Sequence, residues 1–231
     1  MCTKDCLDFG ERCLEIQEVR NKKVLEVGST NVNGSLRNFV VSLGPQQYLG
    51  VDISSGAGVD LICKAEDLVQ TFGANFFDVV ICTEVLEHVR DWRAVISNLK
   101  NVLSPNGILL ITTRSKGFAY HSAPYDFWRY QIPDIKTIFS DLQINNLERD
   151  PSHPGVFLKA RKPDNFNEAV LDEVKLYSIV KRKRLIAIND SKITWIDRKL
   201  NELDSRLRTR IFSFLPPSIK YFIKKKILRV I

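Results

Sequence analysis

The segment from Lys23 to Val41 predicts a strand, a tight turn and a helix in immediate succession. Its first apolar run ends in Glu-x-Gly, and a short polar loop leads into an apolar helical stretch. Glycine at the turn allows the backbone to come close to a ligand. A second strand-like run, Tyr48–Asp52, ends in an acid that is positioned to accept hydrogen bonds from ribose hydroxyls. The two runs predict half of a nucleoside-binding fold, with an ordinary strand-to-helix turn as the alternative.

The glycine pattern argues against a dinucleotide ligand. A pyrophosphate requires G-x-G-x-x-G, because it sits against bare backbone at a helix N-terminus. After Gly28, Thr30 and Asn33 occupy the second and third of those positions. An adenosine without phosphates requires one close approach of the backbone, which Gly28 supplies.

Strand-like and helical runs alternate from residue 7 to residue 161. This alternation predicts an α/β fold with a doubly wound, mostly parallel Rossmann-like sheet of seven strands and an antiparallel edge. Ligands of such sheets bind beyond the carboxyl ends of the strands. The expected strands are 23–27, 47–52, 59–63, 77–82, 107–113, 142–148 and 156–161; the expected helices are 7–20, 34–43, 65–72, 91–103 and 133–140.

Charge divides the chain into two parts. Residues 1–162 carry a net charge of −1, whereas residues 163–231 carry +8. Apolar residues recur at spacings of three and four over 193–211, and 219–231 combines an apolar face with basic side chains. We therefore predict a globular domain at 1–162 and a basic amphipathic helical extension at 163–231. The extension suits a membrane surface, the domain itself or a second copy in a homodimer, with nucleic acid as the less favoured partner.

The chain has five cysteines, an odd number that argues against a disulfide framework and favours a reducing cytoplasm. Cys2, Cys6 and Cys13 lack a CxxC pair and a nearby histidine, so we expect no metal site. The N-terminal residues lack the apolar core of a signal peptide, and no apolar run approaches the roughly 20 residues of a membrane span. These features predict a cytoplasmic protein, peripheral at the inner membrane face if the extension binds lipid.

Two segments carry a family resemblance. Residues 83–92 read TEVLEHVRDW after the fourth expected strand, and residues 121–130 read HSAPYDFWRY after the fifth. With them the chain resembles the class I S-adenosylmethionine-dependent methyltransferases, specifically the group with an E-V-L-E-H signature and its branch with an H-x-x-P-x-D-x-W-R segment. Supporting matches lie in order at 26–28, 50–52, 77–80 and 103–107. The resemblance covers about residues 22–161 and does not include the extension.

The resemblance implies S-adenosylmethionine as the cofactor. Glu26 and Gly28, with the adjacent Ser29, would hold its methionine end, with Glu26 near the ammonium group. Asp52 would bind the ribose, and Ile53 would pack on the adenine.

The same resemblance places acids near the adenine and the methyl group. Glu66 or Asp67 would meet the adenine amine, although both are also favoured as first-turn residues of a helix. Glu84 would lie beside the transferable methyl group. Thr30 and Val32 depart from the family pattern, in which many relatives have glycine at these positions.

Methyl transfer requires the alignment of nucleophile, methyl and sulfur, and a general base is needed only for a hydroxyl or a protonated amine. The candidate catalytic residues are His121, His88, Tyr125 and Asp126. Alternatively, His88 packs after the fourth strand and Asp126 pairs with Arg129. We predict transfer to a small-molecule or glycan/lipid-linked acceptor. The alternatives are an RNA methyltransferase that uses the basic extension as a clamp and a non-catalytic scaffold.

Overall fold

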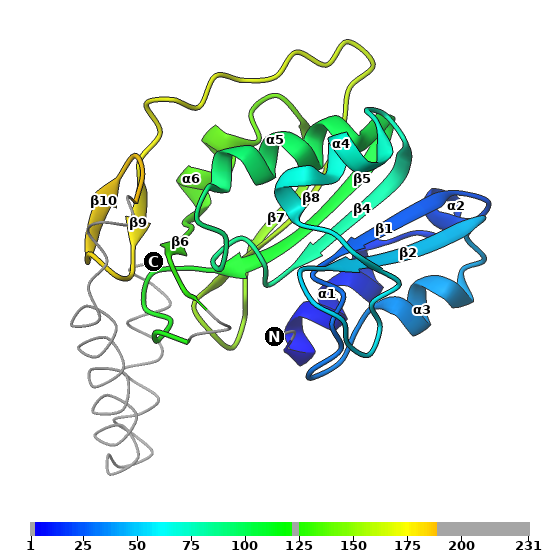
Figure 1. Cartoon of the computed structure of the whole chain (residues 1–231), viewed down its shortest axis with the longest axis horizontal. Helices are drawn as coiled ribbons and strands as arrows, with labels where there is room; N and C mark the ends of the chain where they lie inside the picture. The colour runs from blue at the N-terminus through cyan, green and yellow to red at the C-terminus, as the bar shows by residue number, and fades with distance from the viewer. Residues whose placement is uncertain (1–2, 122–124, 189–231) are drawn as a thin grey trace.

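The computed structural model describes residues 3–121 and 125–188. Seven strands form one sheet in the order β3-β2-β1-β4-β5-β8-β7 (Figure 1). The first five of these are mutually parallel, and β8 runs antiparallel to both β5 and β7. This arrangement confirms the predicted fold class. The strands are β1 (Lys23–Val27), β2 (Gln47–Asp52), β3 (Leu61–Ile62), β4 (Phe77–Thr83), β5 (Leu103–Arg114), β7 (Gln143–Arg149) and β8 (Gly155–Arg161).

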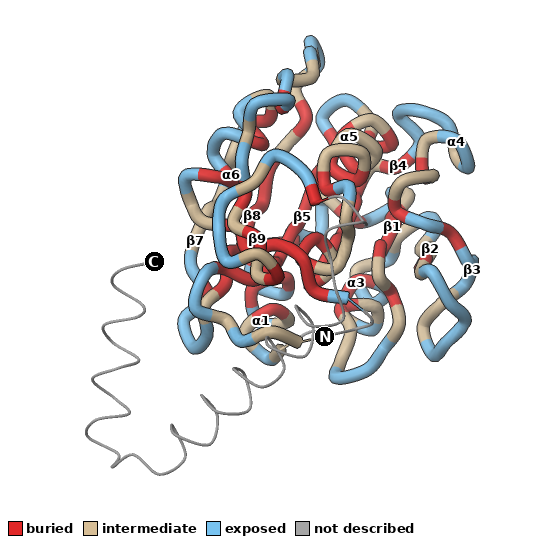
Figure 2. The backbone as a smooth tube through the Cα atoms, turned by 60° about the vertical axis from the view of Figure 1, so that its left-hand side comes forward, coloured by how far each residue is buried: buried red, intermediate tan, exposed pale blue. Residues whose placement is uncertain are grey.

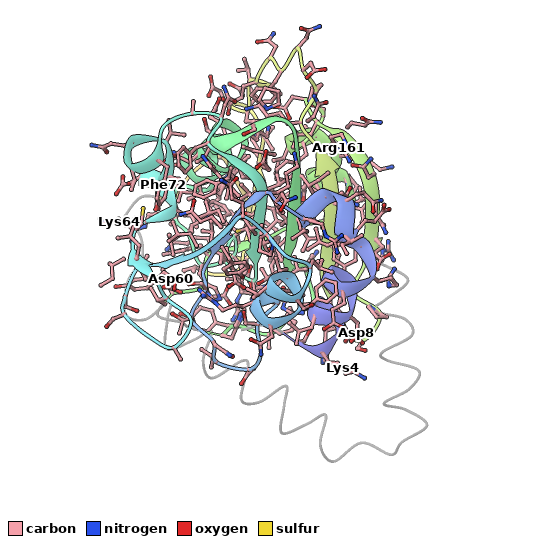
Figure 3. All side chains as sticks on the ribbon, turned by 90° about the vertical axis from the view of Figure 1, so that its right-hand side faces the viewer. Lys4, Asp8, Asp60, Lys64, Phe72 and Arg161 are labelled. Atoms are coloured by element: carbon pink, nitrogen blue, oxygen red, sulfur yellow. The ribbon has the colours of Figure 1, made fainter. Side chains whose placement is uncertain are left out.

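Helices cover both faces of the sheet, so each face buries an apolar core (Figure 1). The smaller core lies under α1 (Lys4–Cys13), α2 (Ile16–Val19) and α3 (Arg37–Ser42). The larger core lies under η1 (Ala65–Asp67), α4 (Leu68–Phe72), α5 (Trp92–Val102) and α6 (Ile132–Ile138). Figure 2 shows the central strands as the buried part of the molecule. Asp60 and Lys64 flank the edge strand β3, and Figure 3 shows both at one side of the molecule.

Local signals explain where the helices begin. Asp91 caps α5 by accepting a hydrogen bond from the amide of Ala94. Gln131 and Asp134 form a capping box at the start of α6. The expected helix 7–20 is instead two helices, because the chain is extended at Leu14 and Glu15.

The segment Pro105–Gly107, a turn signal in the sequence, lies within β5 as the structure bounds it. Asn106 there has φ +63°, and the register of β4 against β5 shifts between Phe77 and Val79. The turn therefore forms an irregular segment near the start of β5, and this strand begins four residues earlier than expected.

The helical extension predicted from residue 163 is wrong for residues 163–188. This segment forms β9 (Leu176–Ser178) and β10 (Lys183–Leu185), which make a three-stranded sheet with β6 (Trp128–Arg129) in the order β10-β9-β6. Leu171, Leu176 and Val180 enter the larger core, so the domain continues past the predicted boundary at 162. The helical patterns over 193–211 and 219–231, and the partners inferred from them, lie outside the described residues.

Arg93 of α5 explains why residues 163–188 follow the domain surface. Its guanidinium donates to the backbone carbonyls of Leu171, Val174 and Ile186, at distances between 2.6 and 2.9 Å. A charged donor satisfies several carbonyls of a segment that has little hydrogen-bonded structure of its own. The spacing of apolar residues along the sequence could not predict this interaction, because Arg93 and the carbonyls that it contacts are far apart in the sequence.

Candidate active site

A cavity of about 770 Å³ opens at the carboxyl ends of β1, β2 and β4. This is the edge at which the sheet topology predicts a ligand, and the volume is in the range of small-molecule sites. The predicted site residues on its wall are Glu26, Gly28, Ser29, Asp52, Ile53, Glu66, Glu84, His88 and Tyr125.

Glu26 offers a fixed carboxylate at the floor of the cavity. It accepts hydrogen bonds from the hydroxyl of Ser35 at 3.2 Å and from the phenol of Tyr48 at 2.7 Å. Burial raises the pKa of Glu26, and these two hydrogen bonds oppose the shift. Within the described part of the chain, Glu26 forms no ion pair with a lysine or arginine, so its charge is available to a cationic group.

Gly28 forms the tight turn after β1. Its φ is +76°, in the region that glycine adopts without strain, and its amide donates to the carbonyl of Val51 at 2.9 Å. A Cβ added at Gly28 would lie 2.1 Å from Cγ2 of Val85. The loop therefore requires glycine at this position both for its conformation and for its packing. The neighbouring Ser29 is buried and lines the cavity.

Asp52 ends β2 with a carboxylate that two backbone amides hold in place. Oδ2 accepts from the amide of Thr30 at 3.1 Å, and Oδ1 accepts from the amide of Ile53 at 2.7 Å. The side chain of Ile53 is 59% exposed at the cavity wall, where an aromatic ring can stack on it. Thr30 thus positions the carboxylate of Asp52 through its backbone amide, an interaction that does not require glycine at residue 30.

The two acids after β3 have different positions. Glu66 lines the cavity, whereas Asp67 is not among the lining residues and stands at the start of α4. Of the two residues expected near an adenine amine, Glu66 is the one whose position suits that contact.

Glu84 lines the cavity, but an arginine holds its carboxylate. Its backbone has φ +58°, and its side chain forms a buried ion pair with Arg114 at the end of β5. Arg114 also contacts Asp150 at 3.0 Å, and the thiol of Cys6 donates to Glu84 at 3.5 Å. Burial raises the pKa of Glu84, and Arg114 opposes that shift. Glu84 lies at the tip of β4, as expected, and the structure shows in addition that the guanidinium of Arg114 is paired with its carboxylate.

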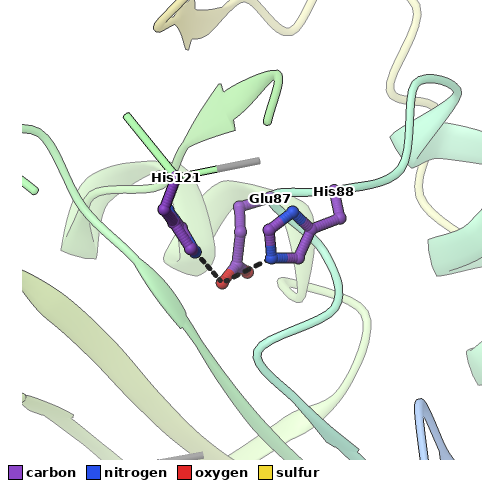
Figure 4. Close-up of side chains that lie close together, drawn as sticks. All are labelled: Glu87, His88 and His121. Atoms are coloured by element: carbon purple, nitrogen blue, oxygen red, sulfur yellow. Dashed lines mark ion pairs between the residues drawn. The ribbon is translucent and has the colours of Figure 1, made fainter. Parts of the chain in front are cut away.

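A second acid of the same segment, Glu87, lies between two histidines (Figure 4). Its Oε1 is 3.8 Å from Nε2 of His88 and 3.9 Å from Nε2 of His121, while Oε2 accepts a hydrogen bond from Thr113 at 2.9 Å. Glu87 is fully buried. Burial disfavours its charged form, but the facing imidazoles outweigh burial and lower the pKa of Glu87.

Asp126 connects this cluster to an arginine. It accepts hydrogen bonds from both terminal nitrogens of Arg129, at 2.5 and 2.7 Å, and lies 3.0 Å from Nδ1 of His121. Burial favours the neutral acid, but hydrogen bonds from Arg129 and His121 outweigh it and lower the pKa of Asp126 to about 2. The Asp126–Arg129 pair is therefore the ion pair that the sequence left as an alternative role for Asp126.

The four predicted catalytic residues fall into two groups. His88 and Tyr125 are on the cavity wall, whereas His121 and Asp126 are not among the lining residues. The rings of His88 and His121 are nevertheless 4.8 Å apart, and Nδ1 of His88 contacts the carbonyl of Tyr125 at 2.5 Å. The structure thus brings all four together, with His88 as the one that reaches both the cavity and Glu87.

The sequence analysis did not identify Glu87, Arg114 or Tyr48 as parts of the site. Glu87 was visible as the second acid of E-V-L-E-H, directly before His88. Arg114 and Tyr48 had no such signal, because their partners lie 30 and 22 residues away in the sequence.

In the part of the chain that the structure describes, no helix has the length and apolarity needed to cross a membrane.

Comparisons with known proteins identify relatives of this domain. A family model described as a methyltransferase domain matches residues 3–150. The ubiquinone biosynthesis O-methyltransferase of Idiomarina loihiensis is 31% identical over 108 residues, which cover 41% of this chain and 43% of that protein. The phosphoethanolamine N-methyltransferase 2 of Caenorhabditis elegans is 24% identical over 200 residues, which cover 76% of this chain and 44% of that protein. The chain thus spans less than half the length of these two curated relatives.

Solved structures share the fold at low sequence identity. The 1,6-didemethyltoxoflavin-N1-methyltransferase of Burkholderia thailandensis superposes with a TM-score of 0.56 and 16% identity, covering 69% of this chain and 79% of that one. A methyltransferase of Mesorhizobium loti gives a TM-score of 0.52 and 15% identity, covering 68% of this chain and all of that one. At such identities these likenesses establish the architecture of the sheet and its helices.

Proposed function

The chain belongs to the methyltransferase domain family, within the class I S-adenosylmethionine-dependent methyltransferases, and from this premise we propose that it methylates a hydroxyl oxygen of a small-molecule acceptor. The cofactor is S-adenosylmethionine, which supplies a methyl group on a sulfonium when it is bound. The observation that carries the proposal is the pair of carboxylates, Glu26 and Asp52, that face one cavity with neutral hydrogen-bond partners.

The residues of the cavity fit the parts of this cofactor. Glu26 is a buried anion next to the glycine turn, which suits an ammonium group. Asp52 retains acceptor capacity for ribose hydroxyls, because each of its oxygens has further lone pairs. Ile53 offers an apolar surface to the adenine, and Glu66 an acceptor to its amine.

The choice of a hydroxyl acceptor rests on His88. Its ring lines the cavity, and the carbonyl of Tyr125 fixes its orientation. Because Nδ1 is engaged by that carbonyl, Nε2 is the ring nitrogen that would accept a proton from a hydroxyl nucleophile. The curated O-methyltransferase relatives support the same acceptor class. A glycan or lipid-linked hydroxyl has the same chemistry and is the alternative acceptor.

Calorimetric titration with S-adenosylhomocysteine tests the cofactor site. Wild type should bind at micromolar concentration, and Asp52→Ala should weaken binding at least tenfold, about 1.4 kcal/mol. Asp67→Ala is the matched control, since Asp67 is an acid outside the cavity lining, and it should leave the affinity unchanged. A folded wild-type protein without affinity would favour the non-catalytic scaffold, and an equal loss in both variants would reject the assigned geometry.

Transfer of an isotopically labelled methyl group to a panel of acceptors tests the substrate class. We expect labelled product with phenolic or catecholic small molecules. Product with lipid-linked sugars would move the acceptor to the alternative, and product with an amine would reject O-methylation. Product with RNA alone would support the rival in which the basic C-terminal residues bind the phosphate backbone.

A further inference from the structure

Residues 163–188, which we call the strap, pack behind one wall of the cavity. That wall, which we call the acceptor wall, is formed by His88, Tyr125 and Phe127. Figure 1 shows β9 and β10 of the strap beside β6, at the opposite end of the view from β1 and β2. The family model matches residues 3–150, so the match assigns no role to the strap.

Phe127 connects the strap to the loop after β4. Its amide donates to the carbonyl of Glu87 at 2.8 Å, and its carbonyl accepts from the amide of Ile179 at 3.0 Å. Its side chain is buried, lines the cavity and stacks on the ring of Tyr125, with the ring centroids 5.6 Å apart. The backbone of this acceptor-wall residue is therefore fixed from two sides, and one of them is the strap.

Trp128 reinforces this connection. It pairs with Ser178 across β6 and β9, and its indole N–H donates to the carbonyl of Arg90 at 3.0 Å. Arg90 also lines the cavity. Because Trp128 and Ser178 are fully buried, water does not compete for these hydrogen bonds while the strap is in place.

The same backbone determines where the ring of His88 lies. Nδ1 of His88 contacts the carbonyl of Tyr125, two residues before Phe127. A shift of Phe127 would displace that carbonyl and, with it, the imidazole that we propose as the proton acceptor. No strap residue is among those that line the cavity, so the strap would act on His88 through Phe127 and Tyr125.

Two arginines outside the cavity lining hold the strap on the domain. Arg93 of α5 donates to three carbonyls of the strap, and Arg184 of β10 pairs with Asp134 of α6. The side chains of Leu176 and Val180 add to the larger core. The strap is therefore held by contacts that can be removed without taking a group out of the cavity.

The cofactor half of the cavity does not depend on these contacts. Among the residues that the structure describes, no hydrogen bond or ion pair joins the strap to Glu26, Gly28 or Asp52. Their partners all come from β1, β2 and the segments that follow these strands. Loosening of the strap should therefore change one half of the cavity and spare the other.

We propose that the strap positions the acceptor wall, with Arg93 and the amide of Ile179 as its positioning residues. Together they hold Phe127, and through it Tyr125 and His88, in the geometry that an acceptor hydroxyl requires, because transfer depends on alignment of the nucleophile. That this wall receives an acceptor rests on the proposed function, whereas the hold of the strap on the wall does not.

Arg93→Met in the full-length protein tests this hold without an acceptor. Amide hydrogen exchange over residues 126–130 should become about tenfold faster, and the imidazole NMR signals of His88 should shift. Exchange over residues 23–30 should stay as in wild type. Arg161→Met is the matched control, because Arg161 also donates to a backbone carbonyl, at 2.8 Å, but outside the strap. This variant should leave residues 126–130 and His88 as in wild type.

Ligand affinity and turnover separate positioning from a general loss of structure. Arg93→Met should bind S-adenosylhomocysteine within about twofold of wild type. With a phenolic acceptor identified by transfer of labelled methyl groups, KM for that acceptor should rise about tenfold. An equal loss of affinity for S-adenosylhomocysteine would overturn the proposal, because both halves of the cavity would then depend on the strap.

Two further results would also overturn it. Faster exchange confined to residues 171–186, with His88 unchanged, would make the strap a cover without influence on the wall. If Arg93→Met fails to fold, Ile179→Pro, which lacks the amide hydrogen, is compared with Ile179→Ala, which keeps it. Only the proline should shift the His88 signals, and equal effects would contradict the assigned role of the amide.

Failure of the proposed function has a different signature. A protein that methylates no acceptor would reject that function. The exchange rates of residues 126–130 and the signals of His88 would still decide whether the strap holds the wall.

Discussion

The acids along the ligand-binding edge of the sheet are held in two different ways. On the side of β1 and β2, Glu26 and Asp52 accept hydrogen bonds from hydroxyl groups and backbone amides. On the side of β4 and β5, Glu84 binds Arg114, and Asp126 binds Arg129. Neutral partners fix a carboxylate and leave its charge for a ligand, whereas an arginine neutralises it. The first side therefore keeps carboxylates whose charge is available to a ligand, whereas the carboxylates of the second side, which we call the framework side, are paired within the fold.

Glu87 is the exception on the second side. It is as buried as its neighbours, but the groups that face it are imidazoles rather than arginines. The cluster therefore contains acids paired with arginine and one acid that faces imidazoles.

The largest effect should come from the framework side. Arg114→Met leaves Glu84 and Asp150 buried without their cation, so we expect the free energy of unfolding to fall by about 3–5 kcal/mol. Urea denaturation measures the change. Arg12→Met is the control, because the Arg12–Glu148 pair is at the surface and should contribute less than about 1 kcal/mol. Equal effects of the two substitutions would remove the distinction between framework and surface pairs.

The glycine turn on the cofactor side should show the next largest effect. Gly28→Ala adds a methyl group 2.1 Å from Val85 at a residue with φ +76°, and we expect a loss of about 1–3 kcal/mol in stability together with loss of cofactor binding. Gly44→Ala separates the two causes, because Gly44 has φ +75° and open space where the methyl group would lie. If Gly44→Ala costs as much as Gly28→Ala, backbone strain alone accounts for the effect.

Substitution of Glu26 should affect binding and stability in different ways. Glu26→Gln removes the charge that faces the cavity, so the affinity for S-adenosylhomocysteine should fall about tenfold, or 1.4 kcal/mol. Stability at pH 7 should stay unchanged or rise, because burial raises the pKa of Glu26 and the ionised form thus opposes folding. Calorimetry and urea denaturation on the same samples measure both quantities. A large loss of stability would place Glu26 with the framework acids.

The smallest effect is a dependence of stability on pH. Between the raised pKa of Glu26 in the folded chain and its ordinary value in the unfolded chain, the folded chain binds more protons. The contribution of Glu26 to the free energy of unfolding should therefore increase as the pH falls through this window. Denaturation of wild type and Glu26→Gln at pH 7 and at about pH 5 measures it, because the other groups cancel in the difference. A wild-type protein that loses stability relative to Glu26→Gln on acidification would contradict the assigned shift.

Much of the fold followed from local patterns. The strands expected at 23–27 and 47–52 have the observed bounds, and α5 differs from its expected range by one residue at each end. Such elements carry their own signal, because their apolar residues are continuous or periodic and their ends are capped. Residues 163–188 lacked this signal. Their short strands depend on β6 and on Arg93, which lie at a distance in the sequence.

The position of the cofactor side was also predictable, because Glu26 and Asp52 lie at the carboxyl ends of β1 and β2 and Gly28 follows β1 directly. The carboxyl ends of parallel strands determine where these residues lie, so they could be placed without tertiary contacts. Asp67 shows where this reasoning stops. Two adjacent acids in one turn look equivalent in the sequence, and the rotation of the turn decides that Glu66 is the one that faces the cavity.

The sequence by itself determined the succession of strands and helices along the chain and the edge of the sheet at which the cavity opens. The tertiary structure decided which acids keep their charge for a ligand. Arg114 neutralises Glu84, and Arg129 neutralises Asp126, while His121 reaches Glu87 from another loop. The physical reason is that a strand or helix depends on the pattern of burial along one segment, whereas the charge state of a buried acid depends on groups that folding brings together from separate segments.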